Sequence, residues 1–326
     1  MDAYRSPLLA TPGAVAATEP DEGVAAHYGD PFREQRRLVA GEGAVDLSHR
    51  GVLRVSGPER LHWLHQLITQ HVEHLEPHQS TSALVLDANG RVEHALYGVD
   101  DGEAFWFHTE RTSAEPLRDY LEKMKFWSQV EVADLTDEFA VVWEPLPAPA
   151  DAHLSRVTER GRDVFVPRAE LTAYVGRTEP AGVWAYEALR IEALEPRQGL
   201  DTDERTIPHE VGWIGTAVHL DKGCYRGQET VARVHTLGRP PRRLVLLHLD
   251  GSVDTLPEHG AAVELDGRAV GTVGSAARHH ELGPIALAVV KRNTPADAEL
   301  LAGGVAAGQE VVVDPEAGLH VRPQLR

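Results

Sequence analysis

The stretch D-K-G-C-Y-R-G-Q-E-T (Asp221–Thr230) is the most informative segment of the sequence, and it holds the only cysteine of the chain, Cys224. Two glycines four residues apart, Gly223 and Gly227, bracket the thiol and permit a tight, irregular backbone that can approach a ligand closely. Lys222 lies two residues before Cys224, and an ammonium group at that range favours the reactive thiolate form. The same pattern is also typical of a surface turn with an incidental thiol, because free cysteine often behaves as a small buried hydrophobe.

Charge is distributed unevenly along the 326 residues, which carry 32 basic and 50 acidic side chains and a net charge of −18. The segment from Lys222 to Arg243 runs against this balance, with six lysines or arginines and one acid, Glu229. Such a segment suits a small anionic ligand, or it is a basic hinge between two acidic domains. Direct nucleic-acid binding is not expected, because the acidic remainder of the chain would repel a long polyanion.

A second informative stretch is R-I-E-A-L-E-P-R-Q-G-L-D (Arg190–Asp201), at the end of a predicted helix. Arg190 and Glu192 fall on different faces of that helix, so they are not a simple local ion pair. A carboxylate held at Glu192 could accept hydrogen bonds from the amino and ring N–H groups of a heterocycle. The alternative is an exposed helix carboxylate, which is the commoner fate of glutamate.

Hydrophobic periodicity predicts a mixed α+β chain. Apolar residues at three- and four-residue steps predict one helix from Pro58 to Leu75, and others follow Thr112 and span 183–194. The turn D-A-N-G (Asp87–Gly90) predicts a β-hairpin. Residues 1–30, rich in Ala, Pro and Gly, are expected to be a surface tail or loop. Further strands are predicted at 51–55, 104–108, 130–133, 139–143 and 164–166, and beyond Pro240 at 244–249, 262–265, 268–273, 285–290 and 310–313.

This pattern predicts the domain organisation. Residues 1–240 form the main region, in two lobes with a break near the Pro-rich segment 145–152. Short strands separated by turn residues follow, and they predict a small C-terminal β-barrel over residues 241–326. The N-terminus lacks the apolar core of a secretory signal, and the sequence contains no apolar run long enough for a membrane helix. We therefore expect a cytoplasmic protein without a membrane partner, which suits its single thiol.

Several common chemistries have no sequence signal. The chain lacks a phosphate-binding G-x-x-x-x-G-K-[ST] loop, a G-x-S-x-G nucleophile elbow and an H-E-x-x-H zinc helix. His62 with His65, and His71 with His74, are spaced i, i+3 on the predicted helix after Pro58. We expect them to be residues of a polar helix face and predict no metal site, because no matching carboxylate–histidine pattern stands on a partner helix.

The string K-G-C-Y-R-G-Q-E (Lys222–Glu229) resembles the signature of the YgfZ family. These folate-binding proteins are related to the glycine-cleavage T-protein (GcvT, aminomethyltransferase). D-L-S-H-R-G (Asp46–Gly51), the helix after S-G-P-E-R, and R-I-E-A followed by P-H-E stand in the order that the family has. The resemblance implies an α+β ring of lobes around a central folate pocket with a C-terminal small β-barrel. It also implies a role in assembling or repairing iron–sulfur clusters.

The resemblance also implies roles for single residues. Glu192 matches the pterin-binding glutamate of the T-protein R-[IL]-E-A-G stretch, although Leu194 stands where that stretch has glycine. T-proteins carry two aspartates after the first hairpin, and this chain has Glu93 and His94 near that place. The cysteine motif, which T-proteins generally lack, is complete. The implied residues are Cys224 and Lys222 for chemistry, Glu192, Arg190, Tyr225, Gln228 and Arg233 for tetrahydrofolate or a derivative, and Gly223, Gly227 and Glu229 for the motif.

Three functions remain open at this point. The leading hypothesis is a tetrahydrofolate-binding accessory factor that acts on iron–sulfur client or assembly proteins. Cys224 would supply one ligand to a shared cluster or attack a one-carbon adduct of folate. The alternative is a folate-dependent aminomethyl or methyl transferase, but the replacement of the two aspartates makes classical aminomethyltransferase activity unexpected. The third is a folate-sensing scaffold that performs no chemistry.

Overall fold

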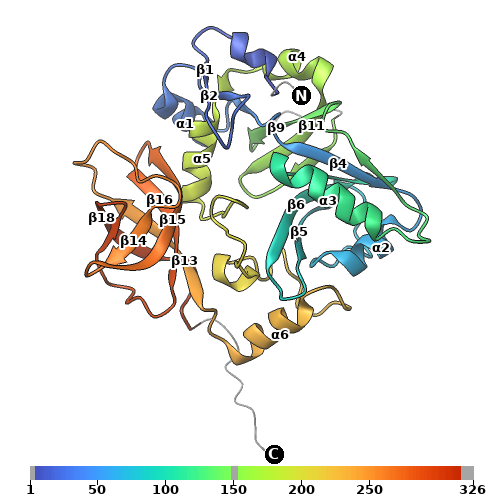
Figure 1. The fold of residues 1–326 in the computed structure, drawn as a ribbon. Helices are drawn as coiled ribbons and strands as arrows, with labels where there is room; N and C mark the ends of the chain where they lie inside the picture. Colours follow the sequence, from blue (N-terminus) through green and yellow to red (C-terminus); the bar gives the residue numbers. More distant parts are fainter. Residues whose placement is uncertain (1–3, 148–152, 317–326) are drawn as a thin grey trace, which may run out of the picture. The chain divides into compact units, whose positions relative to one another are not determined.

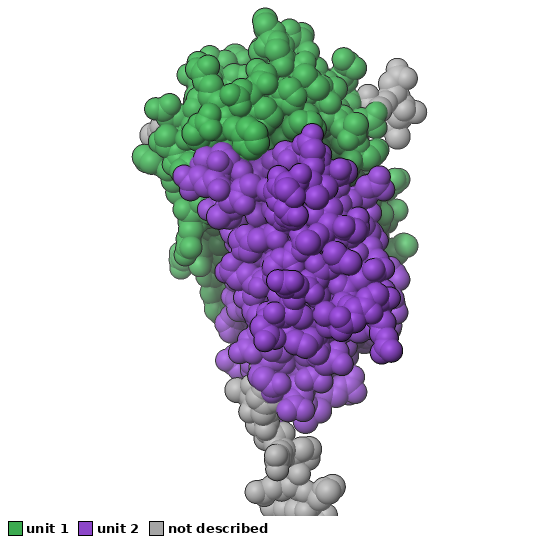
Figure 2. Space-filling model, turned by 90° about the vertical axis from the view of Figure 1, so that its left-hand side faces the viewer, with its two compact units in different colours: residues 1–66, 70–83, 94–186 green, residues 67–69, 84–93, 187–326 purple. Residues whose placement is uncertain are grey.

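The computed structural model describes residues 4–147 and 153–316. Within them the chain separates into two compact units, which Figure 2 distinguishes by colour. Unit 1 comprises residues 1–66, 70–83 and 94–186, and unit 2 comprises residues 67–69, 84–93 and 187–326. Among the described helices, none is long and apolar enough to cross a membrane. The helices are α1 (Pro31–Val39), α2 (Arg60–Leu67), α3 (Arg111–Lys123), α4 (Leu171–Val175), α5 (Val183–Glu192) and α6 (Gln228–Leu237).

Two five-stranded sheets precede the C-terminal strands, and Figure 1 labels several of their members. The first has the order β10-β11-β9-β3-β12 and the second β5-β6-β7-β4-β8. A short pair, β1 (Val15–Ala16) and β2 (Ala25–His27), forms a sheet of its own. The strand bounds are β3 (Ala44–Asp46), β4 (Gly51–Ser56), β5 (Ser80–Leu86), β6 (Val92–Asp100), β7 (Ala104–Thr109), β8 (Glu131–Asp134), β9 (Phe139–Pro145), β10 (Ser155–Val157), β11 (Gly161–Pro167) and β12 (Pro180–Ala181).

Buried charges join the two sheets inside unit 1. Oδ2 of Asp163 on β11 accepts a hydrogen bond from Nη1 of Arg156 on β10 at 2.8 Å. The same oxygen lies 3.1 Å from Nε2 of His108 on β7. Burial alone would raise the pKa of Asp163, but His108 and Arg156 outweigh it and hold that pKa below its usual range. Arg156 also donates to the backbone oxygen of Thr81 and to Oγ of Ser82. The carboxylate is therefore ionised and fixes strands from both sheets against one another.

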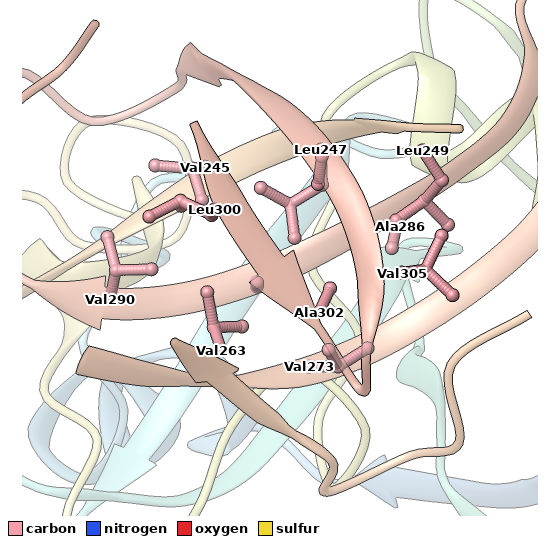
Figure 3. Packing of buried hydrophobic residues seen from close by; sticks show 12 residues of the cluster. Val245, Leu247, Leu249, Val263, Val273, Ala286, Val290, Leu300, Ala302 and Val305 are labelled. Carbon is pink, nitrogen blue, oxygen red and sulfur yellow. The ribbon is translucent and has the colours of Figure 1, made fainter. Parts of the chain in front are cut away.

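The C-terminal strands close into a barrel in the order β13-β16-β15-β14-β17-β18, as the sequence predicts. Their alternating apolar residues, among them Val245, Leu247 and Val290, are fully buried in one cluster. Figure 3 shows these side chains gathered between the strands. The strands are β13 (Arg242–Leu249), β14 (Ala262–Leu265), β15 (Arg268–His279), β16 (Gly283–Lys291), β17 (Leu300–Ala302) and β18 (Val305–Val311).

The helix predicted from Pro58 to Leu75 is wrong in its second half, since α2 ends at Leu67. Thr69 causes the ending. Its backbone N–H donates to the carbonyl of Leu84, and its hydroxyl donates to the carbonyl of Ala217 and accepts from the N–H of Leu84. Because these bonds pair Thr69 with Leu84 of β5, the backbone at Thr69 does not form another helical turn. His71 and His74 consequently lie beyond the helix.

Two other predictions need correction. The first 30 residues do not form a loose surface tail, because β2 lies among them and Val24, Ala25 and Ala26 are buried. The sequence pattern also missed α6, whose ten residues include one buried position, Val231. The predicted break near 145–152 begins where β9 ends at Pro145, and residues 148–152 lie outside the described residues.

Candidate functional site

The cysteine loop of unit 2 is held by its lysine. The Lys222 side chain is buried, its Nζ donates to the backbone oxygen of Ile68 at 2.5 Å, and it lies 5.0 Å from the centre of the Tyr225 ring. Gln228 donates from Nε2 to the Lys222 carbonyl at 3.2 Å. Cys224, between these anchors, is exposed. The contacts of Lys222 thus favour a positioning role in the loop over the predicted role as electrostatic partner of the thiol.

Two glycines from different motifs pack against each other at this loop. Gly227 has a positive φ of 83°, and a Cβ there would lie 2.6 Å from the carbonyl oxygen of Asp87. Gly90, in the hairpin turn, also has a positive φ, and its Cβ would lie 2.7 Å from Cβ of Thr230. The turn between β5 and β6 therefore sits directly on the first turn of α6. Each glycine is predictable as a turn residue, but their mutual contact is not.

Glu93 and His94, which the resemblance predicts to stand near the place of the two T-protein aspartates, have distinct environments. Glu93 receives Nη1 of Arg226 at 2.8 Å, so its carboxylate is paired with the cysteine loop. His94 lies in unit 1 with Nδ1 3.2 Å from Oγ of Ser113. Burial lowers the pKa of His94 to about 4. At neutral pH the first position therefore carries an ion-paired carboxylate and the second a neutral imidazole.

Glu192 ends α5 and stays accessible. Its side chain is 46% exposed, and Oε2 lies 3.5 Å from Nε2 of the buried His279 at the end of β15. Burial lowers the pKa of His279, although the Glu192 charge opposes that shift. The contact with His279 leaves the Glu192 carboxylate accessible to solvent. The carboxylate is thus able to accept hydrogen bonds from a ligand that presents paired N–H donors.

Arg190, predicted as a folate contact, forms its hydrogen bonds with other residues of unit 2. Its guanidinium donates to Glu187, to Asp201 and to the Ser275 hydroxyl, and also to the backbone oxygen of Glu195. These bonds use Nε, Nη1 and Nη2 together, which accounts for the five N–H groups of the side chain. The geometry therefore assigns Arg190 to the packing of unit 2, and its role as a ligand contact has no support.

The remaining predicted residues of the cysteine loop and α6 differ in how deeply they are buried. Tyr225 is buried, and burial raises the pKa of its hydroxyl to about 12. Gln228 is half-buried, whereas Gly223, Glu229 and Arg233 are exposed, the last on α6. The loop and α6 pack around the hairpin turn, while Glu192 packs beside β15. The contacts described here thus form two groups in unit 2, one around the thiol and one around the carboxylate.

Sequence reasoning missed two clusters in unit 1. One is the group of the buried His108 and Asp163 with the partly buried Arg156, whose members come from three strands. The other joins His65, His71 and Glu73, whose ligand atoms lie within 4.8 Å of one another. The first has no local spacing that could reveal it. The second was visible as paired histidines, but the helical interpretation placed them along a single face.

Comparison with known proteins agrees with this architecture. Residues 242–322 match the family model described as the glycine cleavage T-protein C-terminal barrel domain. A chloroplastic transferase of Arabidopsis thaliana is 27% identical over 71% of this chain, and the match spans 61% of that relative. An aminomethyltransferase of Nostoc is 26% identical over 79% of each chain. The crystal structure of aminomethyltransferase T from Bartonella henselae, 19% identical, superimposes with a TM-score of 0.78 over 95% of this chain and 97% of its own.

The chain has the aminomethyltransferase-type fold with its C-terminal barrel domain. The similar proteins carry the names of a transferase and of aminomethyltransferases, so this chain resembles the wider GcvT-like group. The narrower YgfZ assignment stays a prediction. So does the cytoplasmic location, since one relative is chloroplastic.

The close approach of Gly227 to Asp87 predicts a large penalty for Gly227→Ala. The reference is Gly199→Ala, because Gly199 has a similar φ of 81° but open space around it. Both variants carry the strain of a left-handed alanine, about 1–2 kcal/mol. Gly227→Ala adds about 1–3 kcal/mol of steric conflict. Urea unfolding of both variants measures the difference, and equal free energies of unfolding would show that the predicted contact is absent.

The buried imidazole of His94 predicts acid sensitivity. Its pKa is about 4 in the folded chain and about 6.5 when unfolded, so only the unfolded state binds a proton between these values. The contribution of His94 to the free energy of unfolding is fully present above about pH 6.5. It is lost as the pH falls towards 4, by at most about 3 kcal/mol. His94→Gln should reduce this slope in denaturant titrations. His248→Gln, at an exposed position, is the control for replacing a histidine, and an unchanged slope in His94→Gln would contradict the assignment.

Proposed function

We propose that the protein binds tetrahydrofolate or a derivative, with the Glu192 carboxylate as the anchor of the pterin ring. The observation that carries this proposal is the accessible carboxylate at the end of α5, beside a His279 whose pKa is lowered by burial. Aminomethyltransferases of the T-protein family use tetrahydrofolate, and the chain shares their fold. A pterin presents adjacent N–H donors, which a carboxylate accepts in pairs.

The donor set of unit 2 fits such a ligand. Glu192 supplies a pure acceptor for the N–H groups of the ring. Arg233, exposed on α6, is suited to a carboxylate of the glutamate tail of folate. Tyr225 and Gln228 are proposed to act through the loop, because their side chains are buried or bonded to Lys222. Bound tetrahydrofolate would supply the one-carbon carrier, and the protein groups would bind and orient it.

We further propose that the protein serves iron–sulfur client or assembly proteins through Cys224. Support comes from the exposed thiol, held in a loop that Lys222 and Gln228 anchor. An exposed thiolate can bind iron or attack an electrophilic carbon. Support also comes from Glu93 and His94, which leave an ion pair and a neutral imidazole where a transferase has two aspartates.

A second candidate function is aminomethyl or methyl transfer on folate. It is favoured by the relatives themselves, since aminomethyltransferases match about four fifths of this chain. The carboxylate of Glu93 is present at the corresponding place, and a shift of Arg226 would release it, because the pair is partly exposed. The two candidates share the folate site and differ in whether Glu93 or Cys224 performs the essential step.

Folate binding is tested with Glu192→Gln, which keeps the size of the side chain and removes its charge. We expect tetrahydrofolate to raise the melting temperature of the wild type, since a ligand at 100 times its dissociation constant adds about 2.7 kcal/mol. Glu192→Gln should weaken binding by about 1–3 kcal/mol. Glu281→Gln is the matched control, because this exposed carboxylate also acts on His279. Absence of binding to the wild type at millimolar folate would contradict the proposal.

The role of the thiol is tested with Cys224→Ser in cells that lack the protein. If the thiol serves iron–sulfur enzymes, the variant should fold and bind folate as the wild type does, and still fail to restore those enzymes. Aminomethyl transfer, measured as methylene-tetrahydrofolate formed from an aminomethylated carrier protein, separates the two candidates. Multiple turnover by the wild type, retained in Cys224→Ser and lost in Glu93→Gln, would establish the transferase instead.

A further inference from the structure

Five ligand-type side chains crowd the end of α2 within the 13 residues from 62 to 74. Three of them converge: one ligand atom each from His65, His71 and Glu73 lies within 4.8 Å of the other two. His65 is buried, and the other two are partly buried. All belong to unit 1, and none is among the residues assigned above to folate or to the thiol.

The end of α2 at Leu67 creates this convergence. On a continuous helix His65 and Glu73 would be eight residues, or about 12 Å, apart along the axis. Instead the chain turns back after the helix, and Val72 is fully buried between His71 and Glu73. Residues 71–74 belong to neither a helix nor a strand, and the ligand atoms of His71 and Glu73 lie within 4.8 Å of that of His65.

The separations are close to those of a metal centre. Nε2 of His65 lies 4.0 Å from Oε2 of Glu73, and the His65 and His71 ring centres are 4.6 Å apart in an edge-on arrangement. Zinc bonds of about 2.0–2.2 Å in a tetrahedron put ligand atoms about 3.4 Å apart. Small side-chain rotations therefore suffice to close the site around an ion.

A second layer of polar groups orients the carboxylate. Oε1 of Glu73 pairs with Nδ1 of His62 at 2.7 Å, which leaves Oε2 directed at His65. Nε2 of His62 in turn lies 2.9 Å from Nε2 of Gln66. Hydrogen bonds of this kind around metal ligands fix their orientation.

We propose that His65, His71 and Glu73 bind one divalent first-row transition metal ion, with His62 as the outer partner of the carboxylate. Two imidazoles and one carboxylate are a donor set for zinc, iron, nickel or copper, whereas magnesium and calcium take oxygen ligands. Three protein ligands leave a coordination position for water or a substrate. The ion would also fasten segment 71–73 to the end of α2.

The test uses the full chain, stripped with a chelator and titrated with Zn²⁺ against a chromophoric competitor. The wild type should bind one Zn²⁺ per chain. His71→Ala should lower the affinity at least about 100-fold, and His62→Ala should lower it about 10–100-fold, as loss of an outer partner does. His248→Ala is the matched control, because His248 forms a similar pair with Glu310 on the barrel at 3.3 Å.

The variants at His71 and Glu73 separate loss of metal binding from loss of folding. Partly buried His71 and Glu73 are chosen over buried His65 so that the variants fold, which equal melting temperatures without metal would confirm. Glu73→Gln provides an independent second variant with little change in size. A zinc-induced rise in melting temperature that is absent from both variants supports the site. Equal zinc affinity in wild type and His71→Ala, or equal competition by Mg²⁺, would overturn it.

Discussion

The buried guanidinium of Arg190 is the interaction on which unit 2 depends. Its side chain is 4% exposed, and it pairs with Glu187 and with Asp201, which is completely buried. Burial alone would lower the pKa of Arg190, but Glu187 and Asp201 outweigh it and raise that pKa above its usual range. Removal of the cation would leave the completely buried Asp201 without its guanidinium partner, while Glu187 would keep Arg197 at 3.3 Å. A group of this kind specifies one arrangement of its neighbours, because each partner is costly to leave unpaired.

That arrangement joins α5 to the barrel. Asp201 accepts the N–H and the hydroxyl of Ser275, and Arg190 reaches the same hydroxyl. The approach requires Gly274, where a Cβ would lie 2.3 Å from Oδ1 of Asp201, and it coincides with an irregularity in β15 between residues 273 and 276. Because Arg190 is held inward, Glu192, two residues on, projects from another face of the helix beside His279. The buried charge cluster thereby determines where the accessible carboxylate stands.

Local signals predicted the parts of the fold that local physics decides. The D-A-N-G turn gave the β5–β6 hairpin, with Asp87 accepting the N–H groups of Asn89 and Arg91, and alternating apolar residues gave the barrel strands. The end of α2 could not be predicted in this way, because Thr69 leaves the helix for partners at Leu84 and Ala217. The contact of Gly90 with Gly227 and the roles of Lys222 and Arg190 also depend on residues distant in the sequence. In the candidate site the residue types were predictable, but their partners were not.

The basic segment 222–243 is a case in which contacts with residues distant in the sequence change the interpretation of its charge. Its charges suggested either an anion site or a basic hinge, and three of its six basic residues pair with acids within unit 2. Arg226 pairs with Glu93, and Arg242 pairs with both Asp203 and Glu210, which holds the pKa of Asp203 below its usual range. Arg243 is completely buried and bonds to the carbonyl of Thr294 and the side chain of Gln309.

The two pairs of Arg242 bind the start of β13 to the segment 203–210, so part of the local excess of +5 serves the fold. Recognition of a folate in unit 2 cannot then rely on general attraction of its negative tail. The folate binding that we propose would rest on directed contacts, such as the acceptor at Glu192 and single exposed cations such as Arg233. Directed contacts of this kind are less sensitive to salt than a diffuse field, because screening acts most strongly on separated, exposed charges.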